Sequence, residues 1–232
     1  MKIGIIGAME VEVKTLIEAM EETSVRTIAR MEFHEGTLYG KEAVIVRSGI
    51  AKVNAAVCTQ ILCDTYHVTH IINTGVAGSL NNDINIGDIV VSKDCRYHDV
   101  DVEVFGYQHG EVPQMGIVSF PADETMIEQA VTAVHEAAPD VRAFVGTVVS
   151  GDQFIREHAV KERIKEQVGG DCCEMEGTAI AQTAWLNHIP FVVIRAISDK
   201  ADEQTTVSYD EFEALAAVHC AKIVKHMIET IA

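Results

Sequence analysis

Residues 1–13, MKIGIIGAMEVEV, combine a short run of isoleucine and glycine with two glutamates that follow at once. The run at 3–6 is typical of a buried β-strand, and Gly7 permits a tight turn directly after it. Nucleotide-binding βα units start in this way, but their turn offers unobstructed backbone N–H groups to a phosphate. Glu10 and Glu12 occupy this place and would repel a phosphate. The stretch therefore predicts an α/β fold whose first strand ends at a ligand without a tightly held phosphate.

Strand-like and helix-like patterns continue to alternate along the 232 residues, which we expect to form one domain. Apolar runs predict strands at 2–8, 25–30, 32–39, 42–49, 70–75, 88–94, 141–151 and 191–198. Helical periods predict helices at 10–22, 52–66, 122–138, 157–167, 176–188 and from about 208 to 230, where Ser208 and Glu211 form a capping box. Strands without period-2 alternation, separated by helices, indicate a mainly parallel sheet covered on both faces. The segment 100–116 lacks a period and is expected to be an ordered loop.

Acidic residues outnumber basic ones by 35 to 18, which gives a formal net charge of −17. Because such a surface repels nucleic acid and anionic lipid, we expect a small-molecule or protein partner and neither nucleic acid nor a membrane. No apolar stretch reaches the ~20 residues of a membrane span, and the N-terminal run is too short for a secretory signal. The six cysteines show no spacing typical of a disulfide framework. Reduced thiols in the cytoplasm are the simplest interpretation.

Small or acidic residues follow several of the predicted strands. Because ligands of open α/β sheets bind beyond the carboxyl ends of the strands, these clusters together predict a pocket. The clusters are 8–12, 48–50, 74–78, 150–152 and 198–199. The glycine-rich stretch TGVAGS (74–79) has neither the GxGxxG pattern nor the Lys-Ser/Thr ending of a phosphate-binding loop.

Two further stretches carry carboxylates with neighbours of unusual type. Glu174 and Glu176 flank Met175 before an apolar helix, which suits either helix capping or a polyol with an apolar neighbour, such as a ribose carrying an apolar 5′ group. Asp199 directly follows the predicted strand at 191–198. In a partly apolar cleft its carboxyl could serve as a general acid. The segment 97–107 contains His98 and two aspartates, but no second histidine at ligand spacing, so we expect a polar loop or subunit contact and no metal site.

Several of these motifs resemble those of the 5′-methylthioadenosine/S-adenosylhomocysteine nucleosidases, a family of the nucleoside phosphorylase superfamily. The similar stretches include IGIIGAMEVEV (3–13), IINTGVAGSL (71–80), VSGDQFI (149–155), EMEGTAIAQ (174–182) and PFVVIRAISDKAD (190–202). The resemblance extends from residue 1 to about 215. It implies a three-layer α/β/α sandwich around a mixed, mainly parallel central sheet, a homodimer, and no metal or organic cofactor. It also implies irreversible hydrolysis of the N-glycosidic bond of methylthioadenosine and S-adenosylhomocysteine, with 5′-deoxyadenosine as a further substrate, in methionine salvage.

The resemblance implies a role for each site residue. Glu12 would activate water for attack at C1′, Glu176 would accept hydrogen bonds from the ribose hydroxyls, and Asp199 would protonate adenine N7. Ser198 would lie beside Asp199 and Arg195 would support the loop, while Phe154 and Ile155 would bind adenine. The remaining matches fall into three groups: the wall around ribose and the 5′-thio group (Met9, Ile50, Met175, Tyr209), the glycine-rich segment (Val76, Ala77, Gly78), and residues lent by the other subunit (Val102, Phe105, Pro113).

Two positions depart from the family pattern, which often has Ser at the place of Val76 and Ala at the place of Gly177. Neither change affects the three carboxylates, although Val76 lacks a hydroxyl that could influence substrate preference.

Three alternatives stay open: a phosphorolytic purine or uridine phosphorylase, a hydrolase of another nucleoside such as a futalosine-type substrate, and a non-catalytic nucleoside-binding protein. The phosphorylases use a phosphate-binding turn after the first strand, where this chain has residues 9–12.

Overall fold

The computed structural model describes residues 1–201 and 205–231, except for the side chains of 205–211, 213 and 214. The strands are β1 (Lys2–Gly7), β2 (Glu21–Ile28), β3 (Met31–Leu38), β4 (Lys41–Arg47), β5 (His70–Ser79), β6 (Ile89–Tyr97), β7 (Phe120–Pro121), β8 (Ala143–Ser150), β9 (Cys172–Glu174) and β10 (Phe191–Asp199). The helices are α1 (Glu10–Glu18), α2 (Lys52–Asp64), α3 (Glu124–Ala137), α4 (His158–Val168), α5 (Gly177–Leu186) and α6 (Thr205–Thr230), with a 3-10 turn, η1, at Glu103–Phe105. This alternation is the α/β pattern expected from the sequence.

The strands form one mixed sheet in the order β10-β6-β8-β9-β5-β1-β4-β3-β2. Strands β4, β1, β5 and β10 run parallel to one another, and so do β6, β8 and β9. The two groups meet through antiparallel pairs, β10 with β6 and β5 with β9. Since β10 also pairs with β5, the strands β5, β9, β8, β6 and β10 form a closed ring. The hairpin of β2 and β3 extends the sheet at the other edge.

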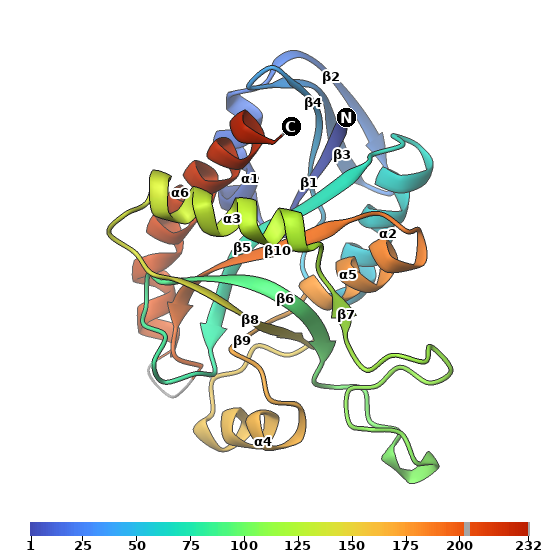
Figure 1. Ribbon diagram of the computed structural model, residues 1–232, viewed down its shortest axis with the longest axis vertical. Helices are drawn as coiled ribbons and strands as arrows, with labels where there is room; N and C mark the ends of the chain where they lie inside the picture. The colour runs from blue at the N-terminus through green and yellow to red at the C-terminus, as the bar shows by residue number, and fades with distance from the viewer. Residues whose placement is uncertain (202–204, 232) are drawn as a thin grey trace.

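Helices cover both faces of the sheet, as Figure 1 shows. On one face α1, α3 and α6 pack together, and their apolar residues join those of β1 and β10 in one core cluster. On the other face α2 packs against α5 over a second cluster that includes Phe33, Phe120 and Val193. The result is a three-layer α/β/α sandwich around a mixed sheet, as predicted. No helix among the described residues is both long and apolar enough to cross a membrane.

Several boundaries differ from the sequence-based expectation. Helix α1 ends at Glu18, not near residue 22, because β2 begins at Glu21. Strand β5 continues to Ser79, so the glycine-rich stretch after residue 74 belongs to a strand and not to a turn. The sequence patterns did not indicate the short strands β7 and β9, which have too few residues for a periodic signal. Helix α6 begins at Thr205, and the side chains of the expected capping box, Ser208 and Glu211, lie outside the described residues.

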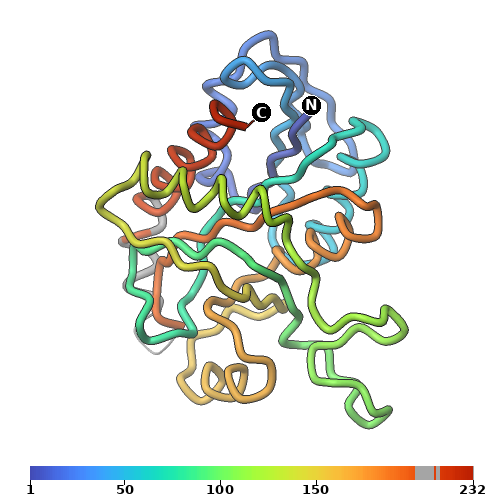
Figure 2. The backbone as a smooth tube through the Cα atoms, in the orientation of Figure 1, coloured from blue at the N-terminus to red at the C-terminus, as the bar shows by residue number. Residues whose placement is uncertain are grey.

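The segment 100–116 projects from the body of the molecule, as the green part of the tube in Figure 2 shows. It contains η1 and turns stabilised by backbone hydrogen bonds, such as Gly110 N to Val100 O at 2.8 Å. On this segment the side chains of Val104 and Phe105 are 87% and 76% exposed. Exposed apolar side chains on a protruding, hydrogen-bonded loop are typical of a contact surface.

Candidate active site

A pocket opens where β1, β5, β9 and β10 meet the starts of α1 and α5. Its walls are mostly apolar, and buried carboxylates face into it from separate elements. The lining residues are Ala8, Met9, Glu12, Ile50, Val76, Ala77, Gly78, Phe154, Cys173, Glu174, Met175, Glu176, Ser198 and Asp199. An apolar cavity with a few convergent polar groups is the usual form of a small-molecule site.

Glu12 lies in the first turn of α1 and is only 4% exposed. Its Oε2 accepts hydrogen bonds from the backbone N–H of Ala8 at 2.7 Å and of Met9 at 2.9 Å. Its Oε1 accepts one from the backbone N–H of Val76 at 3.1 Å. Burial raises the pKa of Glu12, while Arg195 and these backbone donors lower it. The carboxylate is therefore fixed in place and more basic than an exposed one.

Gly75 provides the space for this arrangement, since a Cβ built there would lie 2.4 Å from Oε1 of Glu12. A similar close approach exists beside Asp199, where a Cβ on Gly78 would lie 2.7 Å from Oδ1. The glycines of β5 therefore let two carboxylates approach the strand from different elements. This packing role differs from the phosphate-binding role that glycine-rich stretches have elsewhere.

Asp199 is the last residue of β10 and is 2% exposed. Its Oδ2 accepts a hydrogen bond from Oγ of Ser198 at 2.9 Å, and its Oδ1 accepts one from the backbone N–H of Ala201 at 2.7 Å. These contacts fix the Asp199 carboxyl at the C-terminal end of β10. A ligand in the pocket would therefore contact this carboxyl in a defined orientation.

Glu176 is the residue before α5 and is 7% exposed. Its Oε1 accepts a hydrogen bond from the backbone N–H of Ala51 at 2.7 Å. Burial, followed by the neighbouring carboxylate of Glu174, raises the pKa of Glu176 to about 8. In the absence of ligand this carboxyl therefore has a proton over much of the neutral range.

Arg195 lies behind the pocket, fully within the core, beside Glu174. Its Nη2 and Nε donate to Oε2 of Glu174 at 2.5 and 3.2 Å, and Nη2 also donates to Oδ1 of Asn73 at 2.5 Å. The same Oε2 accepts the backbone N–H groups of Glu176 and Gly177 at 3.1 and 2.8 Å. The ion pair thus joins β10 to the end of β9, the hydrogen bond to Asn73 adds β5, and Glu174 positions the backbone of Glu176 at the start of α5.

The structure brings most of the predicted site residues together. Glu12, Glu176 and Asp199 line one pocket with Met9, Ile50, Val76, Ala77, Gly78, Phe154, Met175 and Ser198. The predicted cluster at 150–152 does not line it; Ser150 Oγ instead donates to Oε1 of Glu174 and accepts the backbone N–H of Thr178.

Several predicted residues lie elsewhere. Ile155 points away from the pocket into a core cluster with Leu80 and Val149, and Arg195 supports the site from behind. The residues that we expect a partner subunit to contribute, Val102, Phe105 and Pro113, lie on the protruding segment and do not line this pocket. The side chain of Tyr209 lies outside the described residues.

Three lining residues are absent from the site residues that the resemblance implied: Ala8, Cys173 and Glu174. Ala8 lies in the predicted cluster 8–12, and Glu174 was considered with Glu176 for helix capping or polyol binding, but nothing in the sequence separates an ion-paired carboxylate from a ligand-binding one. Cys173 belongs to the short strand β9, whose pairing with β5 brings it beside Gly78.

Comparisons with known proteins agree with this geometry. The family model described as "Phosphorylase superfamily" matches residues 2–229. A 5′-methylthioadenosine/S-adenosylhomocysteine nucleosidase of Halalkalibacterium halodurans is 44% identical over 224 residues, which cover 96% of this chain and 96% of that protein. The crystal structure of such a nucleosidase from Neisseria meningitidis, in complex with methylthio-immucillin-A, superposes with a TM-score of 0.95 at 39% identity over 99% of both chains.

A futalosine hydrolase of Helicobacter pylori has the same fold, with a TM-score of 0.93 at 30% identity over 99% of this chain and 98% of that one. The fold alone therefore does not select the substrate. The sequence identity over the full length does select the family. The chain belongs to the phosphorylase superfamily and, within it, to the 5′-methylthioadenosine/S-adenosylhomocysteine nucleosidases.

Proposed function

We propose that the chain hydrolyses the N-glycosidic bond of 5′-methylthioadenosine and S-adenosylhomocysteine, releases adenine, and thereby serves methionine salvage. The observation that supports this most strongly is the convergence of Glu12, Glu176 and Asp199 on one pocket with otherwise apolar walls. Cleavage of a glycosidic bond needs a proton for the leaving group, a base for water, and stabilisation of an oxocarbenium-like sugar. Three carboxyl groups on separate elements can divide these tasks.

In this proposal Asp199 is the general acid for the leaving base. Its Oδ2 already accepts a hydrogen bond from Ser198, and its Oδ1 one from Ala201, so the carboxyl has a fixed orientation toward the pocket. A proton donated to N7 would allow adenine to leave as a neutral base. The aromatic ring of Phe154, which lines the same pocket, offers a flat apolar surface for a purine.

Glu12 is the base that activates the attacking water. Its burial raises its pKa, which makes the carboxylate a better proton acceptor near neutral pH. The three backbone donors on its two oxygens fix its position without neutralising its charge.

Glu176 binds the ribose. An ionised carboxylate can accept hydrogen bonds from two adjacent hydroxyls, and Met175 beside it provides an apolar contact for the 5′-thioether. Because burial leaves this carboxyl protonated near neutrality, binding of a diol would favour its ionised form and release a proton.

The pocket also disfavours the phosphorolytic alternative. Among the described residues that line it, none is lysine or arginine. The guanidinium of Arg195, close behind the pocket, is occupied by Glu174 and Asn73. A phosphate nucleophile would therefore meet buried carboxylates and, among the described lining residues, no cation free to bind it.

We further propose that residues 1–232 form one nucleosidase domain that acts as a homodimer in the cytoplasm. The free thiols of all six cysteines fit a reducing compartment. In the dimer, the protruding segment would contribute Val102, Phe105 and Pro113 to the 5′-thio side of the neighbouring pocket. The 76% exposure of Phe105 supports such a contact.

Replacing either proton-transfer group should abolish most activity. We expect Asp199→Asn and Glu12→Gln each to lower kcat for methylthioadenosine by about 10²–10⁴-fold, since each removes one acid–base group while preserving shape. Adenine release by the purified variants, followed spectroscopically, measures this effect. The dissociation constant of a methylthioadenosine analogue that is not cleaved, measured by calorimetry, should change far less than kcat when Asp199 is replaced by Asn.

Glu10→Gln is the matched control for Glu12→Gln, because Glu10 lies in the same helical turn with its side chain 62% exposed beside Arg47. This control should keep wild-type turnover. Wild-type turnover of Asp199→Asn or of Glu12→Gln would refute the role assigned to that carboxyl.

The raised pKa of Glu176 predicts a pH dependence of stability. Between its ordinary value of 4.5 and about 8, the folded protein holds this proton while the unfolded chain does not. The folded state therefore loses stability as pH rises through this window. Glu176→Gln removes this loss, so the variant should gain stability relative to wild type between pH 5 and pH 8. Urea unfolding of both proteins across this range measures the difference, and a difference that stays constant with pH would contradict the assignment.

The dimer proposal predicts a selective effect of Phe105→Ala. We expect a higher KM for methylthioadenosine and a smaller change for adenosine, because only the former places an apolar group against the contributed wall. Steady-state kinetics with both nucleosides tests this. Val145→Ala, which truncates a half-exposed side chain of β8, is the control and should change neither KM. Equal losses on both nucleosides would refute the contributed wall.

A further inference from the structure

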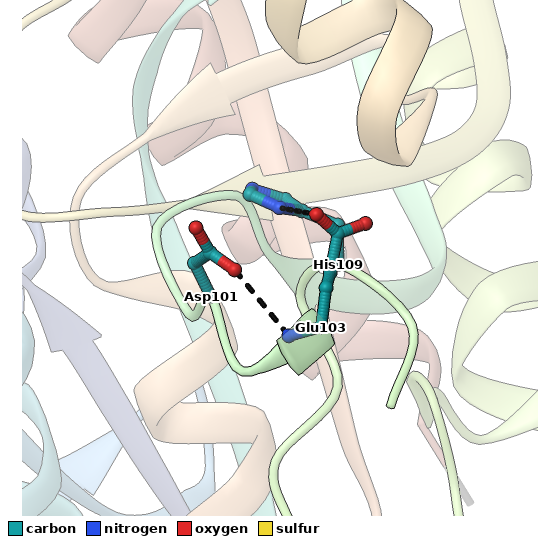
Figure 3. A group of neighbouring side chains, drawn as sticks. All are labelled: Asp101, Glu103 and His109. Atoms are coloured by element: carbon teal, nitrogen blue, oxygen red, sulfur yellow. Dashed lines mark hydrogen bonds and ion pairs between the residues drawn. The ribbon is translucent and has the colours of Figure 1, made fainter. Parts of the chain in front are cut away.

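A second group of chemically active side chains lies on the protruding segment, away from the pocket. Asp101, Glu103 and His109 face one another there, as Figure 3 shows, with one possible ligand atom of each within 4.8 Å of the others. The two carboxylates are exposed, whereas His109 is 8% exposed. The mechanism proposed above uses none of the three.

The orientation of His109 is the decisive feature. Its Nε2 lies 3.1 Å from the carbonyl oxygen of His98, which can only accept, so Nε2 is the protonated nitrogen of the neutral ring. The other nitrogen, Nδ1, is buried without a hydrogen-bond partner. It lies 3.7 Å from Oε2 of Glu103. Metal-binding histidines commonly donate the N–H of one ring nitrogen to a carbonyl oxygen and bind the metal through the other nitrogen. In His109, Nε2 makes such a hydrogen bond and the lone pair of Nδ1 faces carboxylates.

The sequence pattern at 97–107 led us to expect no metal site, but the turns of the segment bring His109 beside it, and we propose that Asp101, Glu103 and His109 bind a divalent first-row transition metal ion such as Zn²⁺. One imidazole nitrogen with two carboxylate oxygens suits this class of ion, whereas Ca²⁺ and Mg²⁺ prefer sites made of oxygen alone. Three protein ligands leave a fourth position for water. Asp101 is already oriented, since its Oδ1 accepts the backbone N–H of Glu103 at 3.4 Å.

Binding requires only a small rearrangement. Bonds of about 2.0–2.2 Å to zinc bring tetrahedral ligand atoms closer together than they lie here. Glu103, with its side chain 56% exposed, can rotate toward Nδ1 without disturbing the core. A bound ion would connect both ends of the stretch that presents Val104 and Phe105, and would thereby stiffen it.

The competing explanation is a plain ion pair between protonated His109 and Glu103. An ion pair and a metal site differ in their response to metal and to substitution. A metal site binds added metal ions, whereas an ion pair does not. Metal affinity at such a site should fall when either Asp101 or Glu103 is replaced, whereas the ion pair involves Glu103 and not Asp101.

Titration of the untagged full-length chain with metal salts tests the proposal. After treatment with a chelator and dialysis, calorimetry with Zn²⁺ should show one ion per chain. Co²⁺ should give the visible absorption of a protein-bound ion. We expect His109→Gln to weaken binding by at least about 100-fold, since loss of a group that merely hydrogen-bonds to a metal ligand already costs about 10–100-fold. Asp101→Asn and Glu103→Gln should weaken it as well.

His226→Gln is the matched control, because His226 Nε2 lies 2.9 Å from Oε2 of Glu136, in a pair that has a single carboxylate. This variant should bind zinc as the wild type does. Absence of stoichiometric binding to the wild type would overturn the proposal. Undiminished binding by His109→Gln would overturn it too, since the metal would then be held by other groups, such as the thiols.

Discussion

The buried ion pair between Arg195 and Glu174 is the interaction on which the site depends. It joins β10 to the end of β9, next to the start of α5, and both side chains are almost fully buried. Removing one member of such a pair leaves an uncompensated buried charge, at a cost of about 3–5 kcal/mol. Any movement that separates the two side chains would carry this cost, so the pair stabilises the arrangement of the strands in the closed ring. The guanidinium of Arg195 also lowers the pKa values of Glu12 and Glu176, although burial raises both of them more, and so helps several carboxylates to share a small apolar space.

The sequence predicted the fold class and three of the four carboxylates that line the pocket, Glu12, Glu176 and Asp199, because these features are local. The strand at 2–7, the turn after it and Glu12 lie within one short stretch, and Asp199 directly ends an apolar strand. The residues themselves already suggested a polyol near Glu176 and a general acid at Asp199, whereas the resemblance to a known family added the water-activating role of Glu12 and the remaining residues of the wall. Long, strongly periodic elements and residues at strand ends are the features that single-sequence patterns describe best.

The remaining features depend on pairings between distant segments. Strand β9 has only three residues, and its place between β5 and β8 is fixed by partners far away in sequence. The ion pair joins residues 174 and 195, so the core position of Glu174 could not be distinguished from a capping role. The segment with Asp101 and His109 has no period, and its cluster forms only because turns bring the two ends together.

The central claim is that water, and not phosphate, cleaves the glycosidic bond in the Glu12 pocket. The most direct measurement is adenine release from 5′-methylthioadenosine in phosphate-free buffer and again with added phosphate, with the sugar product identified by mass spectrometry. The account predicts equal rates and free methylthioribose in both buffers. Release only with phosphate, giving a sugar phosphate, or no release in either buffer, would contradict it.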